Sequence, residues 1–269
     1  MAWTDPDRGN VMLDAADNVV ELAFDETGEG APLLLLHGTN ADRGQFASFR
    51  PLLGPGIRAI ALDQRDSPDS PCAAEPYGMA DHARDIAHFV ERHGLGRVHL
   101  FGSSYGGTVA ASFAIHYPEL TASLVLGATA SSFDQFHAPD LQKVRAQGAD
   151  AVRRFMLEVI LSPEAISAEP TLATEAERLL LIREPAAFAR RGAAVEAYDI
   201  RDSLQRITAP ALVICGDQDP LIRVEEARRM ADAIPDGRFE LLPGSRHGIT
   251  LQNRERTARI VREFVLSHS

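Results

Sequence analysis

Cysteine is scarce in this sequence, which has Cys72 and Cys215 among its 269 residues. Two thiols so far apart predict neither a disulfide framework nor a metal site. Long apolar runs are also missing, since no window approaches the roughly 18 to 20 apolar residues of a membrane span, and the amino terminus MAWTDPDRGN lacks the apolar region of a signal peptide. Excess positive charge is absent too: the formal net charge is -11, which repels nucleic acids and anionic membrane surfaces. We therefore expect a cytoplasmic protein whose partner is a small molecule, not a nucleic acid or a membrane. The sequence leaves homo-oligomerisation open.

Apolar runs of strand length alternate with helical patterns through much of the chain. The runs lack a strict apolar–polar alternation, which is typical of strands buried on both faces of a parallel sheet. Between the second and third runs, residues 83–90 carry apolar side chains at helical spacing. This order predicts an α/β fold with a mainly parallel central sheet flanked by helices, and residues 11–13 and 19–24 predict an antiparallel hairpin at its edge. The runs are residues 33–36, 57–62, 98–101, 124–126 and 211–215.

Strand patterns stop after Ala128 and return at Ala211. The intervening residues show only helical patterns, interrupted by prolines, so we expect them to form a cap inserted into the sheet domain. The predicted division is a first core segment at 1–129, a helical cap at 130–208 and a second core segment at 209–269.

Residues 102–106 read GSSYG and match the pattern G-x-S-x-G around Ser104. They follow a predicted strand and precede a helix expected from about Thr108 to Tyr117, which is the position of a nucleophile elbow. Glycines at 102 and 106 would provide the steric clearance that such a sharp turn needs. A phosphate-binding loop is disfavoured, because neither the Walker lysine nor the G-x-G-x-x-G spacing is present.

A nucleophilic serine needs a base, and the base needs an orienting carboxylate. Asp217 and Asp219 follow one late strand, and His247 lies in the loop after the next. The chain order serine, acid, histidine is the order of the elbow architecture. The sequence thus predicts a triad of Ser104, His247 and one of the two aspartates.

Five motifs occur in order along essentially the whole chain, and with them it resembles the α/β-hydrolase superfamily, in particular its cap-bearing esterases and lactonases. The resemblance implies an α/β-hydrolase fold with an inserted helical cap. The motifs are His37-Gly38, Asp63-x-Arg65 with Ser70, the Gly102–Gly106 elbow, Gly216-x-x-Asp219 and His247-Gly248.

The resemblance also implies roles for individual residues. It favours Asp219 over Asp217 as the acid, and it implies that the backbone N–H groups of Thr39 and Tyr105 form the oxyanion hole. No metal or cofactor is required. The residues expected to contact the substrate are His37, Gly38, Phe133, Phe136 and His137.

The predicted activity is hydrolysis of a carboxylic ester or lactone of small to medium size through an acyl-enzyme. A carbon–carbon bond hydrolase, an acyltransferase and a perhydrolase would use the same triad and stay open as alternatives. A non-catalytic ligand-binding member of the fold is an alternative of another class.

One motif departs from the family pattern. The family commonly has D-x-R-G-x-G-x-S where this chain reads DQRDSPDS, which puts Asp66 and Pro68 at the two glycine positions. Because this loop borders the site, its altered shape puts the common substrates of the family in question; a neutral loop variant is the alternative.

Overall fold

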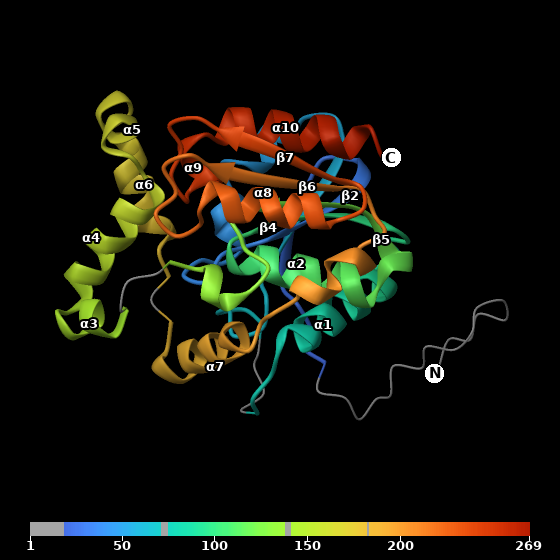
Figure 1. Cartoon of the computed structure of the whole chain (residues 1–269), viewed down its shortest axis with the longest axis horizontal. Coiled ribbons are helices and arrows are strands. Elements are labelled where there is room, and N and C mark those ends of the chain that lie inside the picture. The colour runs from blue at the N-terminus through green and yellow to red at the C-terminus, as the bar shows by residue number, and fades with distance from the viewer. Residues whose placement is uncertain (1–18, 71–74, 138–140, 182) are drawn as a thin grey trace, which may run out of the picture.

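A mainly parallel sheet organises the computed structural model, which describes residues 19–70, 75–137, 141–181 and 183–269 (Figure 1). The strand order is β1-β3-β2-β4-β5-β6-β7. β1 is antiparallel to β3, and every other neighbouring pair is parallel. The predicted mainly parallel sheet is confirmed. The strands are β1 (Phe24–Thr27), β2 (Gly30–Leu36), β3 (Gly56–Leu62), β4 (Val98–Ser103), β5 (Thr121–Gly127), β6 (Ala211–Gly216) and β7 (Gly237–Leu242).

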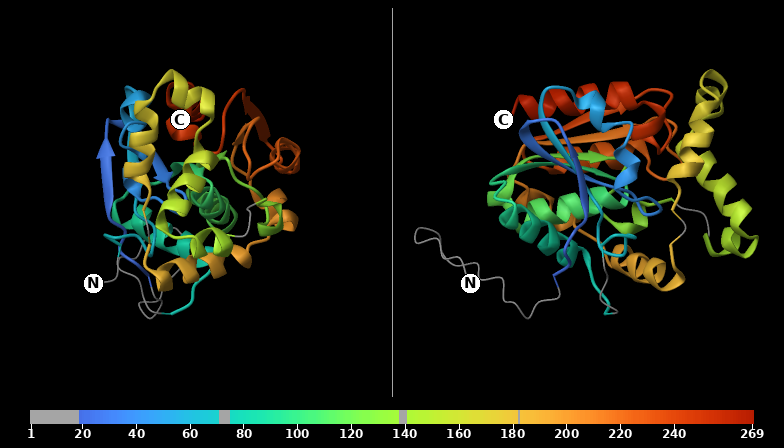
Figure 2. Two further views of the ribbon diagram at one scale, coloured as in Figure 1. Left: turned by 90° about the vertical axis from the view of Figure 1, so that its left-hand side faces the viewer. Right: turned by 180° about the vertical axis from the view of Figure 1, so that it is seen from behind.

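The leucine run in β2 shows why the core strands lack an apolar–polar alternation. Leu34 and Leu36 join the apolar cluster formed with α1, α2 and α8, whereas Leu33 and Leu35 join a second cluster formed with α10. All four side chains are fully buried, because helices cover both faces of the sheet (Figures 1 and 2). The covering helices are α1 (Met79–Arg92), α2 (Tyr105–His116), α8 (Val224–Ala233) and α10 (Arg254–Leu266). The short helix α9 (Ile249–Gln252) directly precedes α10.

The edge of the sheet differs from the predicted hairpin. The predicted strand over residues 19–24 is wrong except at its last residue, because β1 begins at Phe24. The backbone N–H of Val20 donates to the carboxylate of Asp85 (2.9 Å) instead of to a neighbouring strand. A tertiary hydrogen bond has thus replaced the ladder that the apolar pattern predicts. The other predicted strand, residues 11–13, lies outside the described residues.

Helices fill the segment between β5 and β6, as the sequence predicts. α3 to α6 lie beyond the carboxyl ends of β6 and β7, and α7 lies apart from them along the core (Figure 1). Leu161, Leu172 and Ala176 form a small apolar cluster with Leu251 of α9, whereas Ala194 of α7 packs into a main core cluster. The division at 130 and 208 stays a prediction. The inserted helices are α3 (Leu141–Ala146), α4 (Ala149–Ile160), α5 (Pro163–Ala168), α6 (Thr171–Leu179) and α7 (Pro185–Glu196).

Short 3-10 turns complete the connections. They are η1 (Arg43–Phe46), η2 (Arg50–Leu53), η3 (Pro118–Leu120), η4 (Phe133–Gln135) and η5 (Arg201–Arg206). Among the described helices, none has both the length and the apolar character needed to cross a bilayer.

The connection from β4 to α2 is a single residue, Ser104. α2 begins at Tyr105, three positions before the predicted start, because Gly106 and Gly107 already belong to its first turn. A Cβ on Gly102 would lie 2.2 Å from the carbonyl oxygen of Gly106, and a Cβ on Gly106 would lie 2.0 Å from that of Leu36. Both contacts are to backbone, so only glycine permits this packing.

We expect the substitution Gly106→Ala to lower the free energy of unfolding by at least 1–3 kcal/mol, roughly the cost of overpacking a core, because the Leu36 backbone cannot move aside. Gly192→Ala in α7 is the matched control, since no atom lies within 4 Å of its added Cβ. It should leave stability unchanged or raise it by up to about 1 kcal/mol. Urea denaturation measures both, and equal stability of the two variants would contradict the steric argument.

Candidate active site

Ser104 occupies a strained turn at the carboxyl end of β4. Its φ of 54° and ψ of -118° lie in a region that costs a residue with a side chain about 1–3 kcal/mol. Hydrogen bonds hold it there: its N–H donates to the Gly127 carbonyl (2.8 Å), and its carbonyl accepts from the Gly107 N–H (2.8 Å) and the Thr129 hydroxyl (2.9 Å). The side chain is half-buried at the start of α2, where the helix dipole favours negative charge.

Asp219 and His247 form a buried acid–imidazole pair after β6 and β7. The Nδ1 atom of His247 lies 2.8 Å from Oδ2 and 3.1 Å from Oδ1 of Asp219. The carboxylate also accepts the backbone N–H groups of Leu221 (2.8 Å) and Ile222 (3.1 Å), which fix its orientation. Because Nδ1 donates to the carboxylate, Nε2 carries the lone pair of the neutral ring and is able to accept a proton.

The other aspartate makes a different contact. Asp217 Oδ1 accepts the backbone N–H of Gly244 at 2.7 Å and so closes the turn after β7. Between the two aspartates, the geometry therefore pairs Asp219 with the imidazole and gives Asp217 a role in the turn.

The loops that carry these residues contact one another. A Cβ on Gly38 would lie 3.8 Å from the Cβ of Ser104, and one on Gly127 would lie 2.7 Å from the side chain of Ile249. Gln45 links the Gly38 loop to the helix after His247, because its amide oxygen accepts the Gly38 N–H (2.9 Å) and its amide nitrogen donates to Thr250 (3.2 Å). Within the described residues, no hydrogen bond joins the Ser104 hydroxyl to His247. Catalytic hydrogen bonds are often long or poorly aligned in enzymes without bound substrate.

His37 orients the peptide that carries the Thr39 N–H. Its Nδ1 lies 2.8 Å from the Gly38 carbonyl, and its Nε2 accepts the Gln64 N–H (3.3 Å), which assigns the proton to Nδ1. Burial and the nearby charge of Arg191 lower the pKa of His37 well below its usual range, so the ring stays neutral. Both ring nitrogens of His37 are bound to protein atoms and the side chain is fully buried, and its predicted substrate contact stays a prediction.

The two predicted oxyanion donors border the serine turn. The Thr39 N–H belongs to the loop that approaches Ser104, and the Tyr105 N–H opens α2. Neither N–H has an acceptor among the described residues. The Tyr105 ring itself points away into the core, where its hydroxyl lies 2.8 Å from Nε2 of His82 and Arg191 stacks on its face.

The three aromatic residues expected near the substrate lie where the chain leaves β5. Phe133 is exposed, and Phe136 packs against a main core cluster. His137 pairs with Glu226 of α8 at 2.9 Å, and its N–H donates to the carbonyl of Leu221 (2.8 Å). His137 therefore fastens this connection to the Asp219 loop. The substrate contacts of these residues, like that of Gly38, stay predictions.

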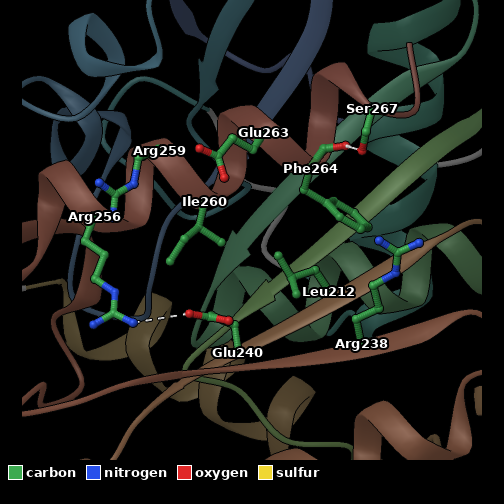
Figure 3. Close-up of a pocket in the computed structure, with 9 residues that line it drawn as sticks. All are labelled: Leu212, Arg238, Glu240, Arg256, Arg259, Ile260, Glu263, Phe264 and Ser267. Atoms are coloured by element: carbon green, nitrogen blue, oxygen red, sulfur yellow. Dashed lines mark hydrogen bonds and ion pairs between the residues drawn. The ribbon is translucent and has the colours of Figure 1, made fainter.

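A surface hollow of about 560 Å³ lies away from this site (Figure 3). Side chains of α10 and of β6 and β7 line it, among them Arg238, Arg256 and Glu240, and neither Ser104 nor His247 belongs to its lining. The parts of the chain that the structure describes contain no group of three or more histidine, cysteine or carboxylate side chains able to hold a metal ion.

The unusual loop after β3 anchors the inserted helices. Asp66 adopts a φ of 64°, so the aspartate takes a left-handed conformation that favours glycine. Its carboxylate accepts hydrogen bonds from Arg190 of α7 (2.6 Å) and from the Tyr77 hydroxyl (2.5 Å). Sequence reasoning missed the partner arginine, because nothing in a helical pattern marks which arginine turns inward.

The end of α4 contacts the loop of the base. The N–H groups of His247 and Gly248 donate to the carbonyls of Val159 (3.2 Å) and Ile160 (3.1 Å). A Cβ on Gly248 would lie 2.4 Å from the Ile160 oxygen, so the His-Gly motif allows the inserted helices to approach this closely.

Several known hydrolases are similar to this chain. The putative carbamate hydrolase RutD of Variovorax paradoxus (strain S110) is 34% identical over 82% of this chain and 87% of its own length. The 2-hydroxy-6-oxo-6-phenylhexa-2,4-dienoate hydrolase of Comamonas testosteroni is 26% identical over 90% of each chain. A solved thermophilic esterase from Thermogutta terrifontis superposes with a TM-score of 0.82 at 27% identity, covering 93% of this chain and 95% of its own.

The family described as "alpha/beta hydrolase fold" matches residues 31–253, a span that runs from β2 to the end of α9 and includes the elbow, the acid and the histidine. The chain belongs to the α/β-hydrolase fold family, and it is a hydrolase.

Proposed function

We propose that this hydrolase cleaves a carboxylic ester or a lactone of small to medium size, with Ser104 as nucleophile, His247 as base and Asp219 as the orienting acid. One observation carries the proposal: a buried carboxylate holds Nδ1 of His247 at 2.8 Å and leaves Nε2 to accept a proton. An imidazole arranged in this way is a general base.

The mechanism proceeds in two halves. His247 Nε2 accepts the Ser104 hydroxyl proton while Oγ bonds to the acyl carbon, and the same proton then passes to the departing alcohol oxygen as the ester C–O bond breaks. Water repeats the sequence: its proton goes to His247, its oxygen bonds to the acyl carbon, and Ser104 regains its proton as the acid is released. Asp219 stays ionised and stabilises the imidazolium that forms in each half.

The oxyanion formed in each half is assigned to the N–H groups of Thr39 and Tyr105. Both are backbone donors held by the fold, so they need little reorganisation as charge develops. Their lack of other acceptors among the described residues supports this role.

Two of the relatives support other candidate activities for the same site, namely cleavage of a carbon–carbon bond and cleavage of a carbamate. They are named as a dienoate hydrolase, which acts on a carbon–carbon bond, and as a putative carbamate hydrolase. We rank ester or lactone cleavage first because it needs only the triad and the two donors, and because the 27% identical structural relative is an esterase. A purified enzyme that cleaves a vinylogous diketone or a carbamate faster than every ester and lactone offered would reverse this ranking.

We expect Ser104→Ala and His247→Ala each to lower kcat by several orders of magnitude on a p-nitrophenyl acyl ester, since each removes one partner of the first proton transfer. Labelling by a fluorophosphonate probe should disappear in Ser104→Ala. Thermal melting serves as the folding control, and undiminished turnover by either folded variant would overturn the assignment.

The two aspartates provide a matched pair. Asp219→Asn should lower kcat by roughly 10³- to 10⁴-fold, the scale seen when an orienting carboxylate is replaced, because an amide favours the wrong tautomer of His247. Asp217→Asn should stay within about threefold of the parent, because its side-chain oxygen can still accept the Gly244 N–H. The reverse ranking would move the acid to Asp217.

A further inference from the structure

The loop after β2 holds five consecutive carbonyls, each with a hydrogen-bond donor. The core supplies the first two: Gln64 Nε2 donates to the His37 carbonyl (2.8 Å), and His37 Nδ1 donates to that of Gly38 (2.8 Å). The other three donors come from the connection between α6 and α7. These are Arg183 Nε to Thr39 (2.8 Å), the Leu181 N–H to Asn40 (2.8 Å) and an Arg183 terminal nitrogen to Ala41.

These bonds determine where the Thr39 N–H points. The Gly38 carbonyl and the Thr39 N–H share one planar peptide, so the bond at Gly38 fixes one end of that plane. The chain beyond Thr39 is free to rotate unless its own carbonyls are held. Arg183 and Leu181 hold them, and without these contacts three neighbouring carbonyls would have no donor among the described residues.

Arg183 is suited to this task by its geometry. Its second terminal nitrogen donates to the carbonyl of Asp66, so the guanidinium is attached to the core at a point outside the loop. The side chain is buried, and among the described residues it forms no ion pair with a carboxylate. A planar guanidinium presents its N–H groups in fixed directions, which a lysine ammonium cannot reproduce.

We infer that Arg183 is a positioning residue for the oxyanion hole: it reaches from the connection between α6 and α7 and holds the loop so that the Thr39 N–H faces the developing negative charge. This inference rests on the proposed function. It gives the segment between α6 and α7 a part in stabilising the transition state.

The test measures kcat and KM on p-nitrophenyl butyrate together with the affinity for butaneboronic acid, which forms a tetrahedral adduct with an activated serine. Arg183→Met should lower kcat by about 10- to 100-fold, somewhat less than the loss of a whole oxyanion donor, with KM within about threefold. Boronate affinity should fall by a similar factor. Arg183→Lys should give an intermediate loss, because a single ammonium nitrogen cannot reach three carbonyls that the guanidinium contacts through three separate nitrogens.

Arg254→Met is the matched control. Arg254 of α10 also joins the core to the inserted segment, through Glu169 and Glu175 (both 2.9 Å), and touches no part of the oxyanion loop. It should keep kcat and boronate affinity within about threefold. An equal loss in both methionine variants would assign the effect to general loosening and overturn the inference.

Unchanged kcat and boronate affinity in Arg183→Met would likewise overturn it. If that variant does not fold, as judged by thermal melting, the lysine variant decides by the same two measurements. A parent protein that neither turns over the ester, nor binds the boronate, nor reacts with a fluorophosphonate would refute the proposed function itself. If the parent enzyme loses its activity in Ser104→Ala but keeps kcat and boronate affinity in Arg183→Met, only the positioning role of Arg183 is refuted.

Discussion

The close crossing of α2 over the end of β2 is the constraint on which the site depends. Gly106 lies so near the Leu36 backbone that a Cβ would come within 2.0 Å of the carbonyl oxygen of Leu36 and 2.8 Å of that of His37. This contact sets the first turn of the helix beside the loop that leaves β2. It therefore sets the helix turn that carries the Tyr105 N–H beside the loop that carries the Thr39 N–H, close to the strained Ser104.

The inserted helices bond to both halves of the proposed machinery. The end of α4 accepts the backbone N–H of His247, and Arg183 and Leu181 hold the loop of Thr39. Asp66 adds a third attachment through Arg190, at a position where the family commonly has glycine. Displacement of this segment would therefore disturb both the proposed base and the loop that carries Thr39.

Sequence reasoning was accurate where a strand buries both faces and where a motif forces one backbone shape. The leucine run of β2 and the apolar runs of β3 to β6 were found because helices cover both sides of the sheet. The prediction failed at the edge, since Val20 bonds to the Asp85 side chain in place of a strand. Sequence reasoning also missed the arginines Arg183 and Arg190. The periodicity of apolar side chains shows which face of a helix is buried, but it does not show which arginine side chain bonds to a distant loop.

By itself, the sequence determined the parallel α/β order, the helical insertion and the residues available for acyl transfer, because apolar runs and the elbow glycines follow from local sterics and burial. The choice between Asp217 and Asp219 needed either a family resemblance or the coordinates. Both residues lie in the loop directly after β6, only two positions apart, and their side chains differ in which partner the loop turns them toward. The tertiary structure alone decided the orientation of the loop that carries Thr39. Its carbonyls find their donors on Arg183 and Leu181, about 140 positions away in the chain, and contacts at such separation leave no local pattern.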